Sequence, residues 1–240
     1  MNVAERVVVV GTVVPGRVLT QPDWLTERIA DMGISWGTGD SRVSGTLWWC
    51  MAASSLVDPL VGAVIAGTSL HPPALPRLAL EVRPDGGIER TLPVDLEPAD
   101  FARTDVEPGE VAAAYDASAL RRPVDTAAAG AALRETLQQV IPVVARVSGA
   151  SAASLWAIVA DAIGNRALDA GDSAAGDRLA HDVAGRLPMP RFVDVGGRRF
   201  VHRISCCLVY EVPSCQMCTS CPKRPAAERE SMLEDVAARS

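Results

Sequence analysis

Five of the six cysteines in this 240-residue chain lie close together near its C-terminal end. Cys206 and Cys207 are neighbours, and Cys215, Cys218 and Cys221 follow in the stretch SCCLVYEVPSCQMCTSC. Thiolate sulfur is a soft ligand that suits zinc, copper(I) and iron–sulfur clusters better than magnesium or calcium. Disulfides among such closely spaced cysteines would close very small, strained loops. The spacing therefore predicts a metal or cluster site.

Local spacing does not decide which four cysteines bind. A zinc ion or a [2Fe–2S] cluster needs four ligands, yet Cys218 completes a Cys-x-x-Cys pair with either Cys215 or Cys221. Adjacent side chains of a regular strand point to opposite faces. Cys206 and Cys207 can therefore reach one centre only where a bulge or a turn interrupts the strand. A [2Fe–2S] rhomb is broader than a single zinc ion, and this eases the constraint.

Composition narrows the class of protein. The formal net charge of −6 argues against a general nucleic-acid binder, which normally has a basic surplus. Hydrophobic residues make up 48% of the chain and charged residues 22%, which is typical of a globular protein. Only Cys50 lies outside the cysteine group, unlike the spread of cysteines in a secreted disulfide scaffold. Because Glu5 offsets Arg6, the first residues lack the positive region of a signal peptide. We therefore expect a cytoplasmic protein.

The elements that must position the cysteines follow from periodicity and turn residues. The patterns predict helices over 23–32, 41–66, 126–147, 151–168 and 174–187, and a terminal helix from about Pro225. Asp23 and Ser41 are the expected N-caps of the first two.

Two hairpins are also expected. Pro-Asp-Gly-Gly interrupts two extended runs within 77–96, and Gly196-Gly197 separates two more. Residues 97–125 have the composition of a loop-rich connection. The fold class is therefore α+β, with a helix-rich body, small antiparallel β-hairpins and a C-terminal cysteine-rich cluster-binding segment. We place the body in residues 1–188, and the second hairpin, the cluster-binding segment and the terminal helix in 189–240.

An apolar stretch over residues 47–70 raises the question of a membrane span. Asp58 and Pro59 lie at its centre, and an acidic side chain at mid-bilayer costs roughly 2.5–3.5 kcal/mol. We therefore expect two buried helical segments that break at Asp58-Pro59. Within this view the tryptophans Trp48, Trp49 and Trp156 are core residues, and Cys50 is a small buried hydrophobe.

At the cysteines the chain resembles a known family. The pattern Cys-Cys-x10-Cys-x2-Cys, preceded by a basic and aromatic strand, is similar to the C-terminal signature of the FhuF-like ferric-siderophore reductases. It is carried by Cys206, Cys207, Cys218 and Cys221 within RRFVHRISCCLVYEVPSCQMCTSC. The resemblance implies that these four residues bind a [2Fe–2S] cluster, whereas Cys215 lies outside the family pattern. Weaker similarity extends to residues 41–60 and 154–168, which look like helices of the larger domain of the family.

The resemblance also implies a function. Members of this family reduce siderophore-bound Fe(III) to Fe(II) and thereby release iron in the cytoplasm, so we expect an oxidoreductase acting on metal ions. The body, residues 1–188, would bind the substrate, and catalysis would need no residue beyond the cluster ligands. The chain lacks a Gly-x-Gly-x-x-Gly fingerprint, so a ferredoxin or an NAD(P)H-linked reductase is the expected electron donor. A ferric siderophore is the expected substrate, and no nucleic-acid partner is expected. The protein could also contact the inner membrane transiently.

A basic stretch precedes the cysteines, and it has two interpretations. Arg199, His202 and Arg203 can offset the charge of four thiolates, or they can form a platform for an anionic chelate or an acidic redox partner. Strand alternation would place Arg199 and Arg203 on one face and Arg198 and His202 on the other.

Two alternative functions stay open at this point. One is a zinc-stabilised binding module without redox activity, and the other is a ferredoxin-like electron-transfer protein. The long region upstream of the cysteines argues against the second alternative, because it greatly exceeds what is needed to house a cluster.

Overall fold

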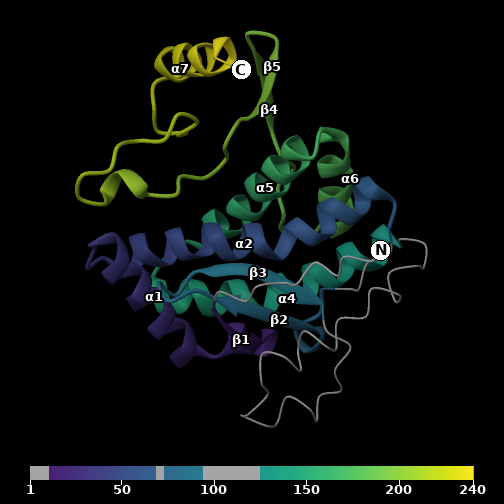
Figure 1. The fold of residues 1–240 in the computed structure, drawn as a ribbon, viewed down its shortest axis with the longest axis vertical. Helices are drawn as coiled ribbons and strands as arrows, with labels where there is room; N and C mark the ends of the chain where they lie inside the picture. Colours follow the sequence, from purple (N-terminus) through teal and green to yellow (C-terminus); the bar gives the residue numbers. More distant parts are fainter. Residues whose placement is uncertain (1–10, 69–72, 94–124, 240) are drawn as a thin grey trace, which may run out of the picture.

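The computed structural model describes residues 11–68, 73–93 and 125–239 (Figure 1). Helices dominate, and two small antiparallel sheets accompany them, which confirms the predicted α+β class. The helices are α1 (Pro22–Trp36), α2 (Ser41–Ala66), α4 (Thr126–Ser148), α5 (Ala152–Asp169), α6 (Ser173–Val183) and α7 (Ala226–Ala238). The strands are β1 (Thr12–Pro15), β2 (Leu78–Val82), β3 (Ile88–Pro93), β4 (Phe192–Val195) and β5 (Arg198–Val201). Most of the connection expected over 97–125 lies outside the described residues.

Helix α2 runs through the middle of the molecule, between the larger sheet and the C-terminal segment (Figure 1). It packs against α1, α4, α5 and β3. Trp48 and Trp49 are fully buried, and each indole satisfies its N–H: Trp48 Nε1 donates to the Gly86 carbonyl and Trp49 Nε1 to the Leu155 carbonyl, both at 2.9 Å. Trp156 is also buried, so the prediction that the three tryptophans are core residues is confirmed.

The expected break at Asp58-Pro59 is wrong, because α2 continues through both residues. A proline within a helix removes one N–H donor and crowds the preceding turn. Leu56 and Leu60, on either side of the pair, are almost fully buried. Asp58 is exposed, and its Oδ1 lies 3.6 Å from Arg166 Nη1 of α5. Tertiary packing of the flanking residues therefore outweighs the local preference of proline.

Among the described residues, α2 is the helix that is long and apolar enough to cross a membrane by length and composition. A helix in the core of a folded domain meets the same criteria, so this is weak evidence for a span. The contacts of α2 with its neighbours give its apolar composition a role in packing.

The first two helices begin with caps that differ from the prediction. Asp40 rather than Ser41 caps α2, and its Oδ1 accepts hydrogen bonds from the backbone N–H groups of Arg42 at 2.8 Å and Val43 at 3.2 Å. Gln21 rather than Asp23 occupies the N-cap of α1, and Pro22 is the first residue of that helix. Proline is favoured there because its missing N–H would have no helical partner.

The larger sheet has the strand order β1-β2-β3, with both pairs antiparallel. The hairpin expected within 77–96 is confirmed as β2 and β3, and its turn is closed by a 2.8 Å hydrogen bond from Arg83 N to the Gly87 carbonyl. The sequence analysis missed β1, whose partner strand lies far along the chain. In register, Thr12 is opposite Val82.

The second hairpin, β4 and β5, confirms the Gly196-Gly197 turn. Both glycines have positive φ, 58° and 78°, as a two-residue turn of this type requires. The hairpin leans on α5, where Gly164 leaves space for Val201 and Phe192. Helix α7 packs against β4 and confirms the predicted terminal helix after Pro225. After β5 the chain passes along α2 on the side away from the larger sheet (Figure 1).

Candidate metal centre

The cysteine segment begins where the second hairpin ends. Val201, opposite Phe192, is the last residue of the β5 ladder, and His202 N adds one 2.8 Å bond to the Arg191 carbonyl. Cys206 and Cys207 therefore lie outside the ladder, but the strand has already ended at Val201, so the bulge or turn expected to interrupt it at the two cysteines is not what separates them. Leu208, directly after them, has a positive φ of 63° and begins a short 3₁₀ turn, η5 (Val209–Glu211).

The sulfur atoms of four cysteines meet in two pairs. Cys206 Sγ lies 3.8 Å from Cys221 Sγ. A hydrogen bond links Cys207 to Cys218. Two thiolates on one tetrahedral metal with bonds of about 2.3 Å would be separated by roughly 3.8 Å. The pairing thus brings together the four predicted ligands, and each adjacent cysteine of the first motif contacts a different cysteine of the second.

The two sulfur pairs can be compared with the ligand sets that a cluster and a single ion require. Within residues 11–68, 73–93 and 125–239, no three cysteine, histidine or carboxylate side chains surround one metal-sized position. Two separate sulfur pairs suit a cluster in which two iron atoms each take two thiolates. A structural zinc ion instead needs four ligands around one point. The chemistry of the sulfur set therefore fits a [2Fe–2S] cluster.

Backbone N–H groups also point to these sulfurs. Leu208 N donates to Cys206 Sγ at 3.4 Å, and Val209 N donates to Cys207. The pKa of the Cys207 thiol is lowered below its ordinary value by a hydrogen bond with Cys218 and by the nearby Arg203 guanidinium. Burial has the opposite, smaller effect. Burial raises the pKa of Cys206. The Arg203 guanidinium and the backbone N–H of Val209 thus favour the anionic form of Cys207.

Arg203 enters the sulfur group from the side of the body. Its side chain is 16% exposed, and Nη1 donates to Cys218 Sγ at 3.6 Å. The guanidinium also hydrogen bonds to Cys207 and to Cys50. Its Nε is buried without a hydrogen-bond partner in the described structure, although it lies 3.6 Å from Asp161 Oδ2. A largely buried donor of this kind, beside Cys207 and Cys218, suits an anionic sulfur-rich group.

Asp161 of α5 anchors the backbone just before the cysteines. Its Oδ1 accepts a hydrogen bond from Ile204 N at 2.9 Å, and its Oδ2 accepts one from Ser205 N at 3.2 Å. The carboxylate is almost fully buried; burial raises its pKa, while the two backbone bonds and Arg203 lower it. The sequence analysis missed this residue. The available signal was a single acid within the apolar run LWAIVADAIG, residues 155–164.

Cys50 is the sixth cysteine, and it lies beside the same guanidinium. The prediction of a simple buried hydrophobe is incomplete, because α2 places Cys50 partly buried and hydrogen bonded to Arg203. Burial raises the pKa of the Cys50 thiol to about 12, opposed by Arg203. A cysteine so far upstream offers no sequence signal of this neighbourhood.

The other predicted basic residues lie elsewhere. Arg199 is exposed and forms a two-bond ion pair with Asp194, from Nε to Oδ1 at 2.9 Å and from Nη2 to Oδ2 at 3.0 Å. Because β5 ends at Val201, strand alternation does not reach Arg203, and the expected shared face of Arg199 and Arg203 is wrong. His202 is partly buried at the end of the hairpin. A role of these residues in substrate binding stays a prediction.

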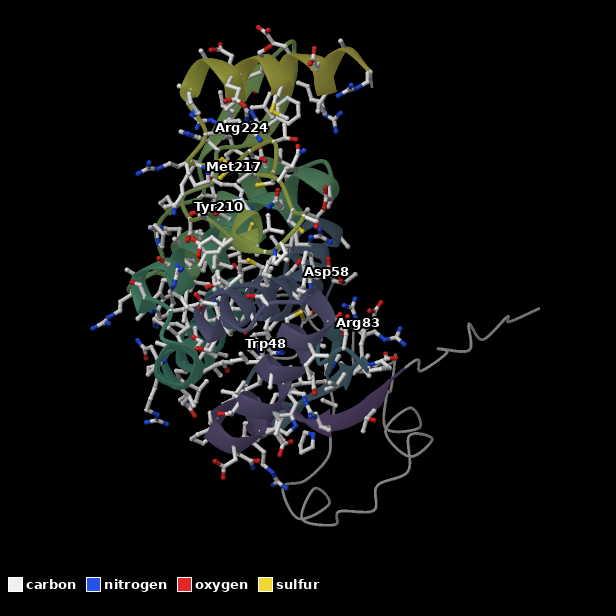
Figure 2. The ribbon with its side chains drawn as sticks, turned by 90° about the vertical axis from the view of Figure 1, so that its left-hand side faces the viewer. Trp48, Asp58, Arg83, Tyr210, Met217 and Arg224 are labelled. Atoms are coloured by element: carbon white, nitrogen blue, oxygen red, sulfur yellow. The ribbon has the colours of Figure 1, made fainter. Side chains whose placement is uncertain are left out.

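The segment is also tied to the body near η5. Arg42 Nη2, at the start of α2, lies 2.6 Å from Glu211 Oε2. Tyr210 donates its hydroxyl to Glu211 Oε1 at 2.8 Å and accepts from Lys223 Nζ at 2.5 Å. Figure 2 shows Tyr210 on the side of the segment that faces the helix carrying Trp48. Glu211 thus ties the middle of the cysteine segment to the start of α2, and Tyr210 links Lys223, just after the last cysteine, to the same residue.

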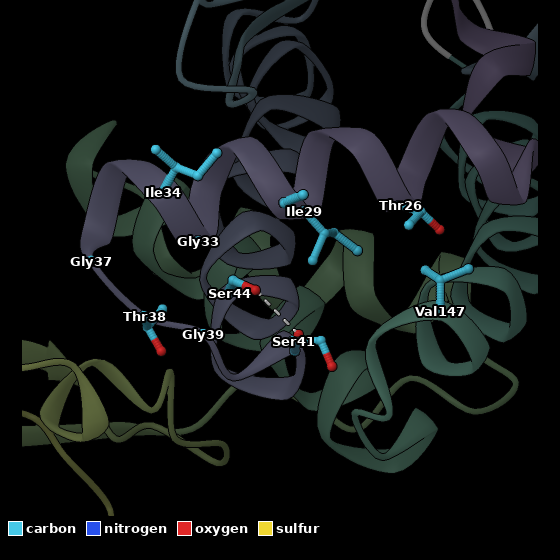
Figure 3. A pocket seen from close by; sticks show the side chains of 11 residues that line it. Thr26, Ile29, Gly33, Ile34, Gly37, Thr38, Gly39, Ser41, Ser44 and Val147 are labelled. Atoms are coloured by element: carbon cyan, nitrogen blue, oxygen red, sulfur yellow. Dashed lines mark hydrogen bonds between the residues drawn. The ribbon is translucent and has the colours of Figure 1, made fainter.

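A separate groove of about 490 Å³ lies between the end of α1 and the start of α2 (Figure 3). Its lining is apolar or small, with Ile29, Ile34 and Val147 beside glycines and hydroxyl residues. Among the described residues that line it, none is charged. The groove therefore offers no ion pair to an anionic ligand.

The cysteine segment matches the model of a known protein family. Residues 203–223 match the FhuF 2Fe-2S C-terminal domain. The match includes all five clustered cysteines and confirms the resemblance inferred from their spacing. The group bound by this segment is accordingly a [2Fe–2S] cluster. No curated protein matches the chain.

Proposed function

We propose that this protein reduces siderophore-bound Fe(III) to Fe(II) in the cytoplasm, with a [2Fe–2S] cluster held by Cys206, Cys207, Cys218 and Cys221. The observation that supports this best is the meeting of the four sulfurs in two pairs inside the matched segment. When bound, a [2Fe–2S] cluster supplies one electron per cycle. This stoichiometry matches the one-electron reduction of ferric iron.

The chemistry of the substrate explains why one electron is enough. Siderophores hold Fe(III) with hard oxygen donors, which bind Fe(II) far less strongly. One electron added to the ferric chelate gives a ferrous chelate, and Fe(II) then passes to other ligands of the cell. An external donor, a ferredoxin or an NAD(P)H-linked reductase, returns one electron to the protein.

Within this proposal the chain has two parts. The region 189–240 carries the cluster, and the body, residues 1–188, binds the ferric siderophore. Arg199 and His202 lie on or near the second hairpin, close in sequence to the cluster segment, and are the candidates to contact the chelate. Asp161 and Arg203 hold the cysteine segment in place. Transient contact with the inner membrane would bring the protein to imported chelates.

The direct test measures electron transfer from the reduced cluster to a ferric chelate. The protein is purified without oxygen, reduced, and mixed with a ferric trihydroxamate in the presence of a colorimetric ligand that traps Fe(II). We expect the visible spectrum of the oxidised cluster to return as Fe(II) appears in equal amount. The gallium(III) chelate is the matched control, because Ga(III) has similar size and charge but does not accept the electron.

Two results would contradict the proposal. A colourless protein that contains zinc and no iron would favour the zinc-stabilised binding module. A coloured protein that exchanges electrons with a ferredoxin but leaves several ferric hydroxamates and catecholates unreduced would favour the ferredoxin-like alternative.

A further inference from the structure

Arg203 donates a hydrogen bond to the sulfur of a predicted cluster ligand, and its side chain is largely buried. Arg203 contacts Cys218 and Cys207 with its guanidinium, and it reaches Cys50 of α2. It thus connects the cluster segment with the core helix. We propose that Arg203 is a positioning residue that sets the reduction potential of the cluster by holding a fixed positive charge against its sulfur ligands.

The contacts of Arg203 hold its guanidinium in a fixed position beside the sulfurs. Asp161 lies 3.6 Å from its Nε, and the same carboxylate holds the backbone N–H groups of Ile204 and Ser205. The guanidinium is therefore kept between an acid of α5 and the sulfurs. Lys223, the single lysine, is exposed and engages Tyr210. Its ammonium meets solvent, which screens its charge.

The expected effect follows from charge. A four-thiolate [2Fe–2S] cluster is anionic when oxidised and gains one more negative charge on reduction. A nearby positive charge stabilises the reduced state more than the oxidised state, and the interaction is stronger where water is excluded. Charge and hydrogen bonds to the sulfurs are established determinants of cluster potential. Arg203 supplies both, so its removal should make the cluster harder to reduce.

This inference depends on the cluster and not on the ferric substrate. A protein that reduces no siderophore but carries the cluster would still test it. Failure of the reductase proposal and failure of this one are therefore distinguishable.

The test compares charge-retaining and charge-removing variants of the full-length holoprotein. Arg203→Lys and Arg203→Gln are titrated by spectroelectrochemistry, and their reduced states are recorded by electron paramagnetic resonance. Arg198→Lys and Arg198→Gln are the matched controls, because Arg198 is exposed on β5 and stacks on Phe200 with its guanidinium carbon 5.3 Å from the ring centre. We expect a more negative midpoint potential in Arg203→Gln, a smaller shift in Arg203→Lys, and none in either control.

Equal potentials in Arg203→Gln and the unsubstituted protein would overturn the proposal. So would equal shifts in Arg203→Gln and Arg203→Lys, since charge would then not be the cause. If Arg203→Gln fails to assemble the cluster, the midpoint potential and the resonance spectrum of Arg203→Lys test the proposal instead. An assembled cluster with an altered resonance signature and a small shift supports the proposal, and loss of the cluster from both variants overturns it.

Discussion

The Sγ atoms of Cys206 and Cys221 lie 3.8 Å apart, although 15 positions separate the two residues in the sequence. Cys207 and Cys218 form the second pair inside this loop. The segment therefore folds back on itself, so that its outermost cysteines meet and its inner ones meet. Cys215 is partly buried on the connecting loop and belongs to neither pair.

The first prediction concerns the ligand set. Single serine substitutions at Cys206, Cys207, Cys218 or Cys221 should lose the cluster or markedly alter its spectrum, because a hydroxyl replaces a soft anionic ligand. Cys215→Ser is the matched control and should keep both the visible spectrum and the iron content. An intact cluster in Cys221→Ser together with its loss in Cys215→Ser would move the second ligand pair to Cys215 and Cys218. The family spacing would then not apply.

The second prediction concerns the anchor of the segment. Asp161→Ala removes the acceptor of two backbone N–H groups and leaves the buried Arg203 without its acidic neighbour. Breaking a buried pair in this way should lower the free energy of unfolding by about 3–5 kcal/mol. Iron bound per chain should fall as well, because the backbone before Cys206 loses its anchor. Both are measured by urea unfolding of the metal-free protein and by iron analysis after reconstitution.

Asp169→Ala is the control for that substitution. Asp169 is on the same helix and pairs with Arg166 at 2.9 Å, but its side chain is 64% exposed. An exposed pair contributes only about 0–1 kcal/mol. Equal destabilisation by the two alanine variants would show that Asp161 has no special anchoring role.

The third prediction concerns pH. The hydrogen bond from Tyr210 and the Arg42 guanidinium lower the pKa of Glu211 below its ordinary value. A lowered folded-state pKa stabilises the protein above the unfolded-state pKa of about 4.3, and this contribution disappears as the pH falls through the folded-state pKa. Glu211→Gln should therefore lower the free energy of unfolding by about 0.2–1 kcal/mol at neutral pH. In acid the difference should vanish.

The measurement for Glu211 is urea unfolding of the metal-free protein across the acid range, with Arg42→Gln as the partner variant. If the ion pair is responsible, combining the two substitutions should cost little more than either alone. A Glu211→Gln effect that stays constant from neutral to acid pH would refute the assigned cause.

The fourth prediction concerns the turn of the second hairpin. Gly196 and Gly197 both have positive φ, so alanine at either position should cost about 1–2 kcal/mol of stability. At Gly196 a new Cβ would also lie 2.9 Å from Ala237 Cβ of α7, whereas at Gly197 nothing lies within 4 Å. Gly196→Ala should therefore be the more destabilising variant in urea unfolding. The reverse order would mean that α7 does not pack on this turn.

Local signals in the sequence were enough for the cluster motif and for most elements. The spacing from Cys206 to Cys221 predicted a metal or cluster site and carried the family resemblance that implied [2Fe–2S], because ligand spacing is a property of a short stretch of chain. Gly196-Gly197 located the second hairpin, since only glycine adopts positive φ at both positions without steric cost. The predicted bounds of the second helix, 41–66, are those of α2, but its cap was misplaced by one residue: Asp40 rather than Ser41 is the N-cap.

What the sequence by itself determined is thus the cofactor-binding segment, the α+β class and the approximate order of elements. The tertiary structure decided the rest: that α2 continues through Pro59, that β1 joins the sheet, and that Asp161, Cys50 and Arg203 meet at the sulfurs. Each of these depends on contacts between residues far apart in the chain. Burial and pairing across such distances stabilise conformations that local preferences disfavour or leave open, because packing energy is shared by whole elements and not by neighbouring residues.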